Sequence, residues 1–384
     1  MRPQPDVPYY EYEEKLKGER IPYYESWLGE EELRQVTEVI RKNWISEGEK
    51  TRAFEDRLAA MHERKYALAV VNCTAALIIG LKAMGIGEGD EVIAPTFTFI
   101  ASVNAIRLAG ATPVLVDVDP KTFTLDLAAA ARAVTPRTKA IMPVHIYGHP
   151  ADLEGVLALA KKHNLRVIED TAQGLGVKYR GRPAGSFGDV ACLSFFPDKA
   201  ITLGEGGLVM TNSDELFREL LMLKNDGRLE RGIYFHDRVG YNFRITDLQA
   251  AVGLAQLDKL PRIIEGKRRN VELYRKYLGD AEGLEFTYQA PDCYVVPHRV
   301  NVLVDDPEAL AAHLAGRGIG CRRFYYPVHQ QPCYRLPGPF PVAERLFARG
   351  LSFPSAPTLE EKQIAFIAEH VKTYLGSLRK AAVH

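Results

Sequence analysis

The chain has 384 residues, of which 46% are hydrophobic and 26% charged, so it is long enough for two packed domains and its composition excludes a disordered protein. Its 49 basic and 49 acidic residues balance, so no overall charge draws it onto nucleic acid or an anionic membrane. It contains no apolar run of bilayer length and no apolar signal segment, and its five cysteines include no C-x-x-C pair, so we expect reduced thiols and a cytoplasmic location.

The first half of the chain is predicted to form an α/β domain. After a charged, tyrosine-rich segment of about twenty residues that we expect on the surface, apolar spacing predicts helices over 30–42 and 51–65. Strands are predicted at 67–71, 91–94, 113–118, 140–144, 166–168, 190–195 and 208–211. Helical patterns at 75–84, 125–134 and 151–163 lie between them, which indicates βαβ units and a mostly parallel sheet buried on both faces.

The pattern changes in the second half. Helical spacing over 246–260 and 262–278 is interrupted by Pro261, and proline commonly breaks the interior of a helix. Less regular patterns at 294–304, 308–317 and 360–374 indicate a smaller α+β unit. We therefore expect two domains, a large one over residues 1–260 and a small one over residues 261–384.

Lys199 lies in a short loop between the predicted strands at 190–195 and 208–211. Most lysines are solvated surface charges, but this one follows an apolar run and precedes Gly204, Gly206 and Gly207. Glycines let the backbone approach a ligand closely or adopt a positive φ angle. A partly desolvated amine in such a loop is suited to forming a Schiff base, which indicates a pyridoxal-phosphate enzyme.

Glu169 and Asp170 follow a predicted strand directly, at the edge of the sheet where open α/β folds bind ligands. An acidic residue here could equally cap a helix that begins at Thr171, so this segment alone leaves both interpretations open. A carboxylate beside a pyridine nitrogen keeps that nitrogen protonated and makes the ring an electron sink. Together with Lys199, Asp170 is the predicted partner of the ring.

A phosphate site is predicted at residues 71–76, where a strand leads into a helix whose first turn lacks bulky or charged side chains. Backbone N–H groups, the Thr74 hydroxyl and the helix dipole together suit an anion. The alternative is an ordinary threonine N-cap. Ser194 offers a second hydroxyl to the same phosphate.

Spacing excludes other familiar sites. The glycines at 85–90 and 174–179 do not fit G-x-G-x-x-G after a strand, so a nicotinamide site is not expected. His145 and His149 are interrupted by Gly148 and followed by Pro150, so we expect a structural histidine pair and no metal. The sequence contains no Walker A or G-x-S-x-G motif.

With these residues in place, nearly the whole chain resembles the sugar aminotransferases of nucleotide-sugar pathways (DegT/DnrJ type), and within them the perosamine-synthase-like enzymes. The resemblance rests on the Lys199 loop and on segments 44–48, 72–77, 87–99, 143–148, 167–173, 185–189 and 240–251. It implies the aspartate-aminotransferase fold, or PLP fold type I: a large domain with a mixed, mostly parallel sheet and a smaller C-terminal α+β domain.

The resemblance also implies how the cofactor is held. Lys199 would carry pyridoxal 5'-phosphate and Asp170 would face the ring nitrogen. Phe99 would stack on the ring, although Phe97 could serve instead, and Asn242 would reach the phosphate in the neighbouring subunit of an obligate homodimer. The complete set of predicted cofactor contacts is Thr74, Ala75, Phe99, Asp170, Gln173, Ser194, Lys199 and Asn242.

The implied reaction is a ping-pong transamination from L-glutamate to a keto group of a nucleotide-linked deoxysugar, with a 4-keto-6-deoxyhexose as the expected acceptor. His329, Tyr326 and Arg323 in the small domain are candidate substrate contacts, with Arg323 facing a diphosphate. A segment rich in tyrosine and proline can also simply pack one domain on another, and both interpretations stay open.

Three alternative functions remain. The enzyme could aminate a 3-keto sugar, it could be a pyridoxal-phosphate-dependent deoxysugar dehydratase, or the chain could be a non-enzymatic sugar-nucleotide-binding regulator. The dehydratases of this family replace the Schiff-base lysine with histidine, so Lys199 argues against them. A regulator is expected to have lost the lysine or the aspartate, and this chain keeps both.

Overall fold

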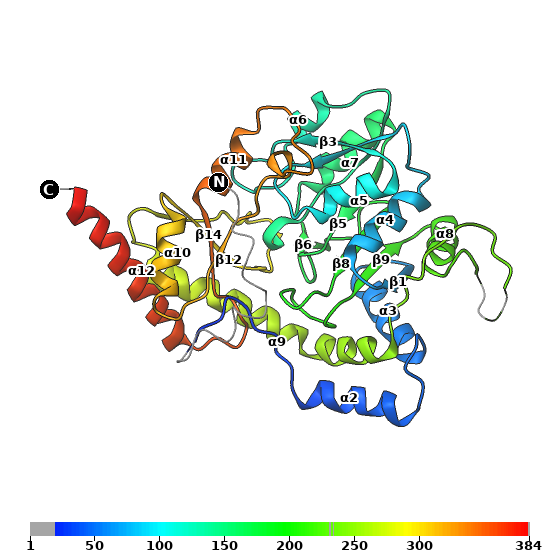
Figure 1. Cartoon of the computed structure of the whole chain (residues 1–384), viewed down its shortest axis with the longest axis horizontal. Coiled ribbons are helices and arrows are strands. Elements are labelled where there is room, and N and C mark those ends of the chain that lie inside the picture. Colours follow the sequence, from blue (N-terminus) through cyan, green and yellow to red (C-terminus); the bar gives the residue numbers. More distant parts are fainter. Residues whose placement is uncertain (1–19, 230–231, 233, 383–384) are drawn as a thin grey trace.

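A central sheet of seven strands organises the large domain in the computed structural model, which describes residues 20–229, 232 and 234–382 (Figure 1). Most of the predicted surface segment, residues 1–19, lies outside the described residues, and near its end Ile21 is buried in a core, contrary to the prediction. In spatial order the strands are β1 (Tyr66–Val70), β9 (Gly207–Thr211), β8 (Val190–Ser194), β5 (Arg166–Asp170), β4 (Thr138–Ile141), β2 (Glu91–Pro95) and β3 (Thr112–Val116). All seven predicted strands are present, with ends shifted by a few residues.

The sheet is mixed but mostly parallel. The five strands from β8 to β3 run parallel to one another, whereas β9 pairs antiparallel with both β8 and β1. The predicted fold class is therefore confirmed. Because β5 and β8 are parallel neighbours, their carboxyl ends lie together at one edge of the sheet, and Asp170 and Ser194 end these two strands.

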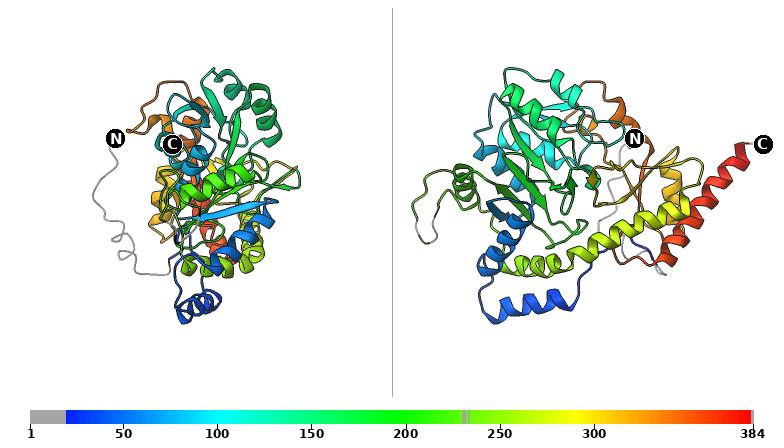
Figure 2. Two further views of the ribbon diagram at one scale, coloured as in Figure 1. Left: turned by 90° about the vertical axis from the view of Figure 1, so that its right-hand side faces the viewer. Right: turned by 180° about the vertical axis from the view of Figure 1, so that it is seen from behind.

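Helices cover both faces of the sheet, as the views in Figures 1 and 2 show. Alternate residues of β1 point to opposite cores: Leu68 and Val70 pack with one set of helices, and Ala67 and Ala69 with another. The first core contains α4 (Cys73–Ala83), α5 (Ala101–Ala109) and α8 (Asp214–Lys224). The opposite face is covered by α3 (Glu49–Met61), α6 (Leu127–Arg132), α7 (Leu153–His163) and α9 (Asp247–Leu278).

One long helix connects the two halves of the chain. The helical patterns predicted on either side of Pro261 belong to one uninterrupted helix of 32 residues, α9, which contains this proline in its interior. Buried Leu257, Leu260 and Ile263 pack into the core of the large domain around the proline, and this packing offsets the lost backbone hydrogen bond. Helix α2 (Glu30–Arg41) lies against α9 on the side away from the sheet (Figures 1 and 2).

The second half of α9 packs with a smaller antiparallel sheet and its helices. Val271, Tyr274 and Leu278 of α9 share a core with the four-stranded sheet. Its strand order is β10 (Leu284–Phe286), β12 (Val300–Val304), β14 (Gly350–Phe353) and β13 (Arg322–Arg323). Helices α10 (Pro307–Ala315), α11 (Pro341–Arg349) and α12 (Glu361–Ala382) accompany it, and a minor sheet joins β6 (Lys178–Tyr179), β7 (Arg182–Pro183) and β11 (Cys293–Tyr294). In the described part of the chain, no helix is both long and apolar enough to cross a membrane.

A buried polar network fixes the end of β5. The fully buried Glu169 carboxylate accepts hydrogen bonds from the backbone N–H groups of Gly185, Phe187 and Gly188 at 2.7–2.8 Å. Arg64 and His145 also contact it, at 3.4 and 3.2 Å. Burial alone would raise the pKa of Glu169, but these partners, led by His145, lower it to about 2. Glu169 therefore stays ionised and anchors the strand that carries Asp170.

The neighbouring His62 predicts acid sensitivity of the fold. Its Nδ1 lies 2.8 Å from the carbonyl oxygen of Ala184, and burial lowers its pKa from 6.5 to about 4. Below pH 6.5 the imidazole of His62 is protonated in the unfolded chain but stays neutral in the folded chain. The stability of the fold is therefore fully present above pH 6.5 and is progressively lost as the pH falls towards 4. In His62→Asn, whose amide can still donate to Ala184, this loss should disappear.

We expect the unfolding free energy of the wild type to fall between pH 7 and pH 5 by about 2 kcal/mol more than that of His62→Asn. Urea denaturation followed by circular dichroism at both pH values measures this difference. Parallel pH dependence in the two proteins would show that His62 does not carry the effect.

Candidate active site

A cavity of about 360 Å³ opens where β5 and β8 end. Its position agrees with the edge at which open α/β sheets bind ligands. Six of the predicted site residues line it: Thr74, Phe99, Asp170, Gln173, Ser194 and Lys199. These residues come from widely separated parts of the sequence, and the parallel strands bring them together.

Lys199 extends into this cavity from the loop that follows β8. Its side chain is only 13% exposed, and its Nζ lies 3.0 Å from Oδ1 of Asp198. Gly204 in the same loop has a φ of 79°, which favours glycine. At Gly207 a Cβ atom would lie 2.3 Å from the backbone carbon of Asn72, so glycine is required for the loop to meet the start of α4.

Asp170 is held rigidly. Its Oδ2 accepts a hydrogen bond from the Ser102 hydroxyl at 2.7 Å, and its Oδ1 accepts one from the N–H of Ala172 at 3.1 Å. The hydroxyl of Thr98, in the loop before α5, lies 2.9 Å from the Ser102 hydroxyl, so Thr98, Ser102 and Asp170 form a short hydrogen-bonded chain. Burial raises the pKa of Asp170 despite these hydrogen bonds. The sequence did not single out Ser102, although it follows the 87–99 motif closely.

The start of α4 suits an anion, but its cap differs from the alternative considered for Thr74. Asn72 is the N-cap, and its Oδ1 accepts from the N–H of Ala75 at 2.8 Å. Thr74 therefore does not cap the helix, and it lines the cavity from the first turn of α4. The buried Ala75 is not among the lining residues, and its N–H is already used by Asn72. The amides of Cys73 and Thr74 are the ones in this turn that the cap does not use.

The structure distinguishes Phe99 from Phe97. Phe99 is 55% exposed and lines the cavity, whereas Phe97 is fully buried in a core that both halves of the chain share. Gln173 lies on the same wall: its Oε1 accepts from the N–H of Tyr147 at 2.7 Å, and its Nε2 donates to the hydroxyl of Tyr325 at 3.1 Å. Tyr325, from the small domain, also lines the cavity, so side chains from both halves of the chain form its wall.

Four other predicted residues do not reach this cavity. Asn242 is exposed beside Asn225 and does not line the cavity within one chain. His329 is buried, with Nδ1 2.8 Å from the Thr96 hydroxyl and Nε2 3.2 Å from Glu344. The remaining two, Tyr326 and Arg323, both pack against Phe347. The three small-domain residues thus have structural partners and do not line this cavity, which favours the packing interpretation, while substrate contact stays a prediction.

A charged cluster behind Lys199 was not expected from the sequence. Asp198 binds Lys199 and also lies 3.1 Å from Nη2 of Arg299 and 3.6 Å from Nε2 of His298. Burial alone would raise the pKa of Asp198, but the surrounding His298, Lys199 and Arg299 hold it well below its ordinary value. The one carboxylate therefore joins the lysine loop to the small domain.

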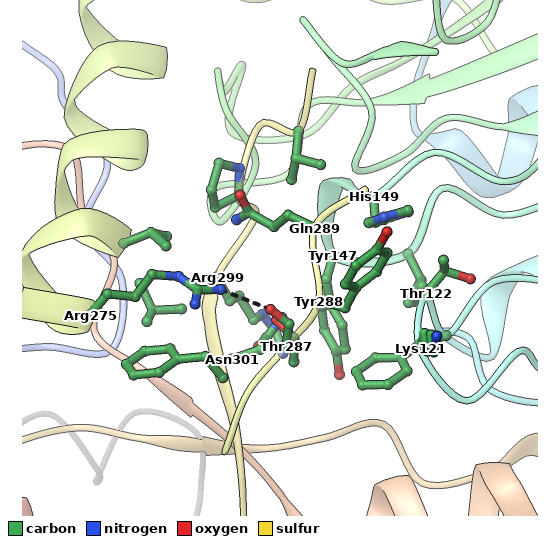
Figure 3. A pocket seen from close by; sticks show the side chains of 17 residues that line it. Lys121, Thr122, Tyr147, His149, Arg275, Thr287, Tyr288, Gln289, Arg299 and Asn301 are labelled. Atoms are coloured by element: carbon green, nitrogen blue, oxygen red, sulfur yellow. Dashed lines mark hydrogen bonds between the residues drawn. The ribbon is translucent and has the colours of Figure 1, made fainter. Parts of the chain in front are cut away.

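Arg299 separates the main cavity from a smaller one. It lines both, and the second cavity holds about 30 Å³ between α9, β12 and the loop after β10 (Figure 3). There, Arg275 of α9 donates a hydrogen bond to the carbonyl oxygen of Thr287 at 3.0 Å. The guanidinium of Arg299 is packed against the rings of Tyr23, Tyr147 and Tyr325 at 5.0–5.9 Å.

Comparison with known proteins agrees with this geometry. The GDP-perosamine synthase of Escherichia coli O157:H7 is 41% identical over 359 residues, covering 92% of this chain and 98% of the relative. A UDP-N-acetyl-3-dehydro-alpha-D-glucosamine 3-aminotransferase of Acidithiobacillus ferrooxidans is also 41% identical, over 355 residues, with 91% and 95% coverage.

A solved structure is similar over the same length. DesV of Streptomyces venezuelae, in complex with a ketimine intermediate, superposes with a TM-score of 0.88 at 36% identity, covering 93% of this chain and 98% of that one. The model of the DegT/DnrJ/EryC1/StrS aminotransferase family matches residues 27–372. The predicted family is therefore confirmed: this chain is a member of the DegT/DnrJ/EryC1/StrS aminotransferase family.

Proposed function

We propose that this enzyme is a pyridoxal-phosphate-dependent aminotransferase that moves the amino group of L-glutamate to a keto group of a nucleotide-linked keto-deoxysugar. The observation that carries the proposal is that the Lys199 amine and the Asp170 carboxylate line the same cavity. A hydrogen bond from Ser102 holds the carboxylate in place, and the two residues lie at the ends of neighbouring strands. Membership of an aminotransferase family supports the same chemistry.

The residues present fit this cofactor. The unused amides at the start of α4, with the hydroxyls of Thr74 and Ser194, suit its phosphate. Asp170 suits the ring nitrogen, and the exposed Phe99 offers a ring to stack on. Lys199 supplies the amine. We also propose that residues 1–260 form the cofactor-binding domain and residues 261–384 the small domain, with α9 shared between them.

When bound, pyridoxal phosphate supplies an aldehyde that condenses with amines and a ring that accepts electrons from the bond being broken. Lys199 Nζ takes the proton from the α-carbon of the donor and later returns a proton to the acceptor carbon. Asp170 keeps a proton on the ring nitrogen, and the hydrogen-bonded chain through Thr98 and Ser102 orients its carboxylate. The rings of Phe99 and Tyr325 line the cavity 5.8 Å apart, with Tyr147 stacked on Tyr325 behind them, and would limit the access of water to the reacting atoms.

For the acceptor we propose a 4-keto-6-deoxyhexose linked to a nucleotide, supported by the similarity to a GDP-perosamine synthase. A 3-keto sugar is the second candidate, since a 3-aminotransferase is as similar. Incubating the glutamate-treated enzyme with 3-keto and 4-keto sugar nucleotides, followed by mass spectrometry of the product, distinguishes the two. The cytoplasmic location stays a prediction.

We further propose a homodimer with shared sites. Asn242 is exposed and lies outside the cavity of its own chain, so it is available to a neighbouring subunit. Leu33 and Ile40 on α2, with Trp44 and Ile45 just after it, are each more than half exposed, which is unusual for large apolar side chains gathered on one segment. Such a surface fits a second copy of the chain.

The role of Lys199 predicts a spectral difference. Wild-type protein with added pyridoxal phosphate should absorb visible light, and L-glutamate should remove that band. In a separate sample without glutamate, borohydride reduction should leave the cofactor attached to the peptide that contains Lys199. Lys199→Ala should show none of these. The matched control is Lys267→Met, which removes the other buried amine nearby and should keep the band. A colourless wild type, or labelling of Lys267, contradicts the proposal.

The role of Asp170 predicts a large kinetic effect. Asp170→Asn keeps the shape but loses the charge, so the rate of the reaction with glutamate should fall by roughly 100-fold or more. Ser102→Ala should cost far less, because the N–H of Ala172 still holds the carboxylate. Stopped-flow absorbance measures both. Equal losses of rate in the two variants would show that the orientation of the Asp170 side chain, and not its charge, determines the rate.

Shared sites predict complementation between inactive subunits. Lys199→Ala and Asn242→Asp should each be nearly inactive, the second because its new charge repels the phosphate. In a mixed dimer, one site has the intact lysine from one subunit and the intact asparagine from the other. Refolding an equal mixture should thus restore about one quarter of wild-type activity. No recovery beyond the sum of the parents would mean that each site belongs to one chain.

A further inference from the structure

The two residues of strand β13 point in opposite directions. Arg322 and Arg323 pair with Ser352 and Leu351 of β14, so their side chains alternate across the small sheet. Arg323 donates to the carbonyl oxygen of Phe347 and lies 3.4 Å from Glu308, on the side away from the cavity. Arg322 lines the cavity that contains Lys199. The strand therefore presents one arginine to the candidate active site.

Arg322 is held in place by an aromatic ring. Its guanidinium lies 4.9 Å from the centre of the Tyr23 ring. Tyr23 is itself fixed next to the strand, because Ile21 exchanges backbone hydrogen bonds with Gly318 and Gly320, at 3.0 and 2.9 Å. When a guanidinium stacks face-on against an aromatic ring, its N–H groups still point outward in the plane of the guanidinium and can bind an anion there.

The charges around Tyr23 are incompletely paired. Arg299 lies 5.0 Å from the same ring and is 5% exposed, and its Nε and Nη1 have no hydrogen-bond partner among the described residues. Among the described residues, Asp198 is the one carboxylate that pairs with Arg299, and it is shared with Lys199. Arg322 has no carboxylate within 4.0 Å in the part of the chain that the structure describes. This wall of the cavity thus carries two guanidinium groups and lacks an anion.

We propose that Arg322, stacked on Tyr23 and backed by Arg299, binds the carboxylate of the amino donor. The inference rests on the proposed function. Guanidinium groups bind carboxylates in a bidentate, charge-assisted manner. The donor's α-carboxylate is bonded to the very carbon that Lys199 deprotonates, so it must lie inside this cavity. The diphosphate of a 4-keto hexose is attached at C1, across the sugar ring from the reacting carbon, and lies farther from Lys199.

Binding of an unreactive analogue tests the proposal without turnover. Glutarate has two carboxylates and no amine, and calorimetry on the cofactor-loaded protein gives its Kd. Arg322→Gln should weaken binding by about 10- to 100-fold. Arg322→Lys keeps the charge but cannot donate two parallel hydrogen bonds to a carboxylate. Its Kd for glutarate should therefore lie between the Kd values of Arg322→Gln and wild type. Arg323→Gln is the matched control on the opposite face and should bind as wild type does.

The two half-reactions identify the source of the anion. With glutamate, Arg322→Gln should show a raised apparent Kd for the donor and a limiting rate that changes much less. With the keto-sugar nucleotide, its apparent Kd should stay near that of wild type. A loss confined to the nucleotide reaction assigns Arg322 to the diphosphate and overturns the proposal, as does identical behaviour of Arg322→Gln and Arg323→Gln. A wild type that does not react with glutamate refutes the proposed donor, and the glutarate measurement then still tests Arg322.

Discussion

The alternation of side chains at the end of β5 is the constraint on which the site depends. Glu169 points into the interior, where three backbone N–H groups, Arg64 and His145 fix it, and Asp170 points into the cavity. Neighbouring residues therefore differ in position: the Glu169 carboxylate holds the strand, and the Asp170 carboxylate lines the cavity. Because Glu169 is fully buried and fully bonded, Asp170 cannot shift without breaking that network. A rigid carboxylate is what an electron-accepting ring requires.

A second constraint connects the two domains. Asp198 precedes Lys199 and binds Arg299, which belongs to the small-domain side of the cavity. Helix α9 crosses from one core to the other without a break and fixes how the two sheets face each other. The cavity is consequently lined by side chains from both halves of the chain, including Tyr325 and Arg322. A lysine on a loop becomes a precisely placed amine only because the small domain supplies the opposite wall.

The chemistry of the cavity follows from how its polar groups are satisfied. Asp170 accepts hydrogen bonds from Ser102 and Ala172. The first amides of α4 and the guanidinium of Arg322, which is stacked on Tyr23, have no hydrogen-bond partner among the described residues. Groups of the first kind are fixed elements of the site, and groups of the second kind await a ligand. This distinction favours a phosphate at α4 and a carboxylate at β13. It also explains why Arg323, with its own partners, is directed away from the cavity.

The sequence by itself determined the strands of the central sheet, the family, and the residues next to strand ends, because period-2 and period-3.6 patterns and local motifs are short-range signals. It placed Asp170 at the edge of the sheet where ligands bind, and it named Lys199, Thr74 and, through the family resemblance, Phe99 as contacts of the same cofactor. Only the tertiary structure decided between Phe97 and Phe99, showed that Asn72 and not Thr74 caps the helix, and brought Arg322, which the sequence had not singled out, to the cavity. Each of these choices depends on which face of an element packs against a distant segment, and a shift of one residue in a strand reverses the face. The continuity of α9 through Pro261 is of the same kind, since buried contacts on both sides of the proline override its local preference.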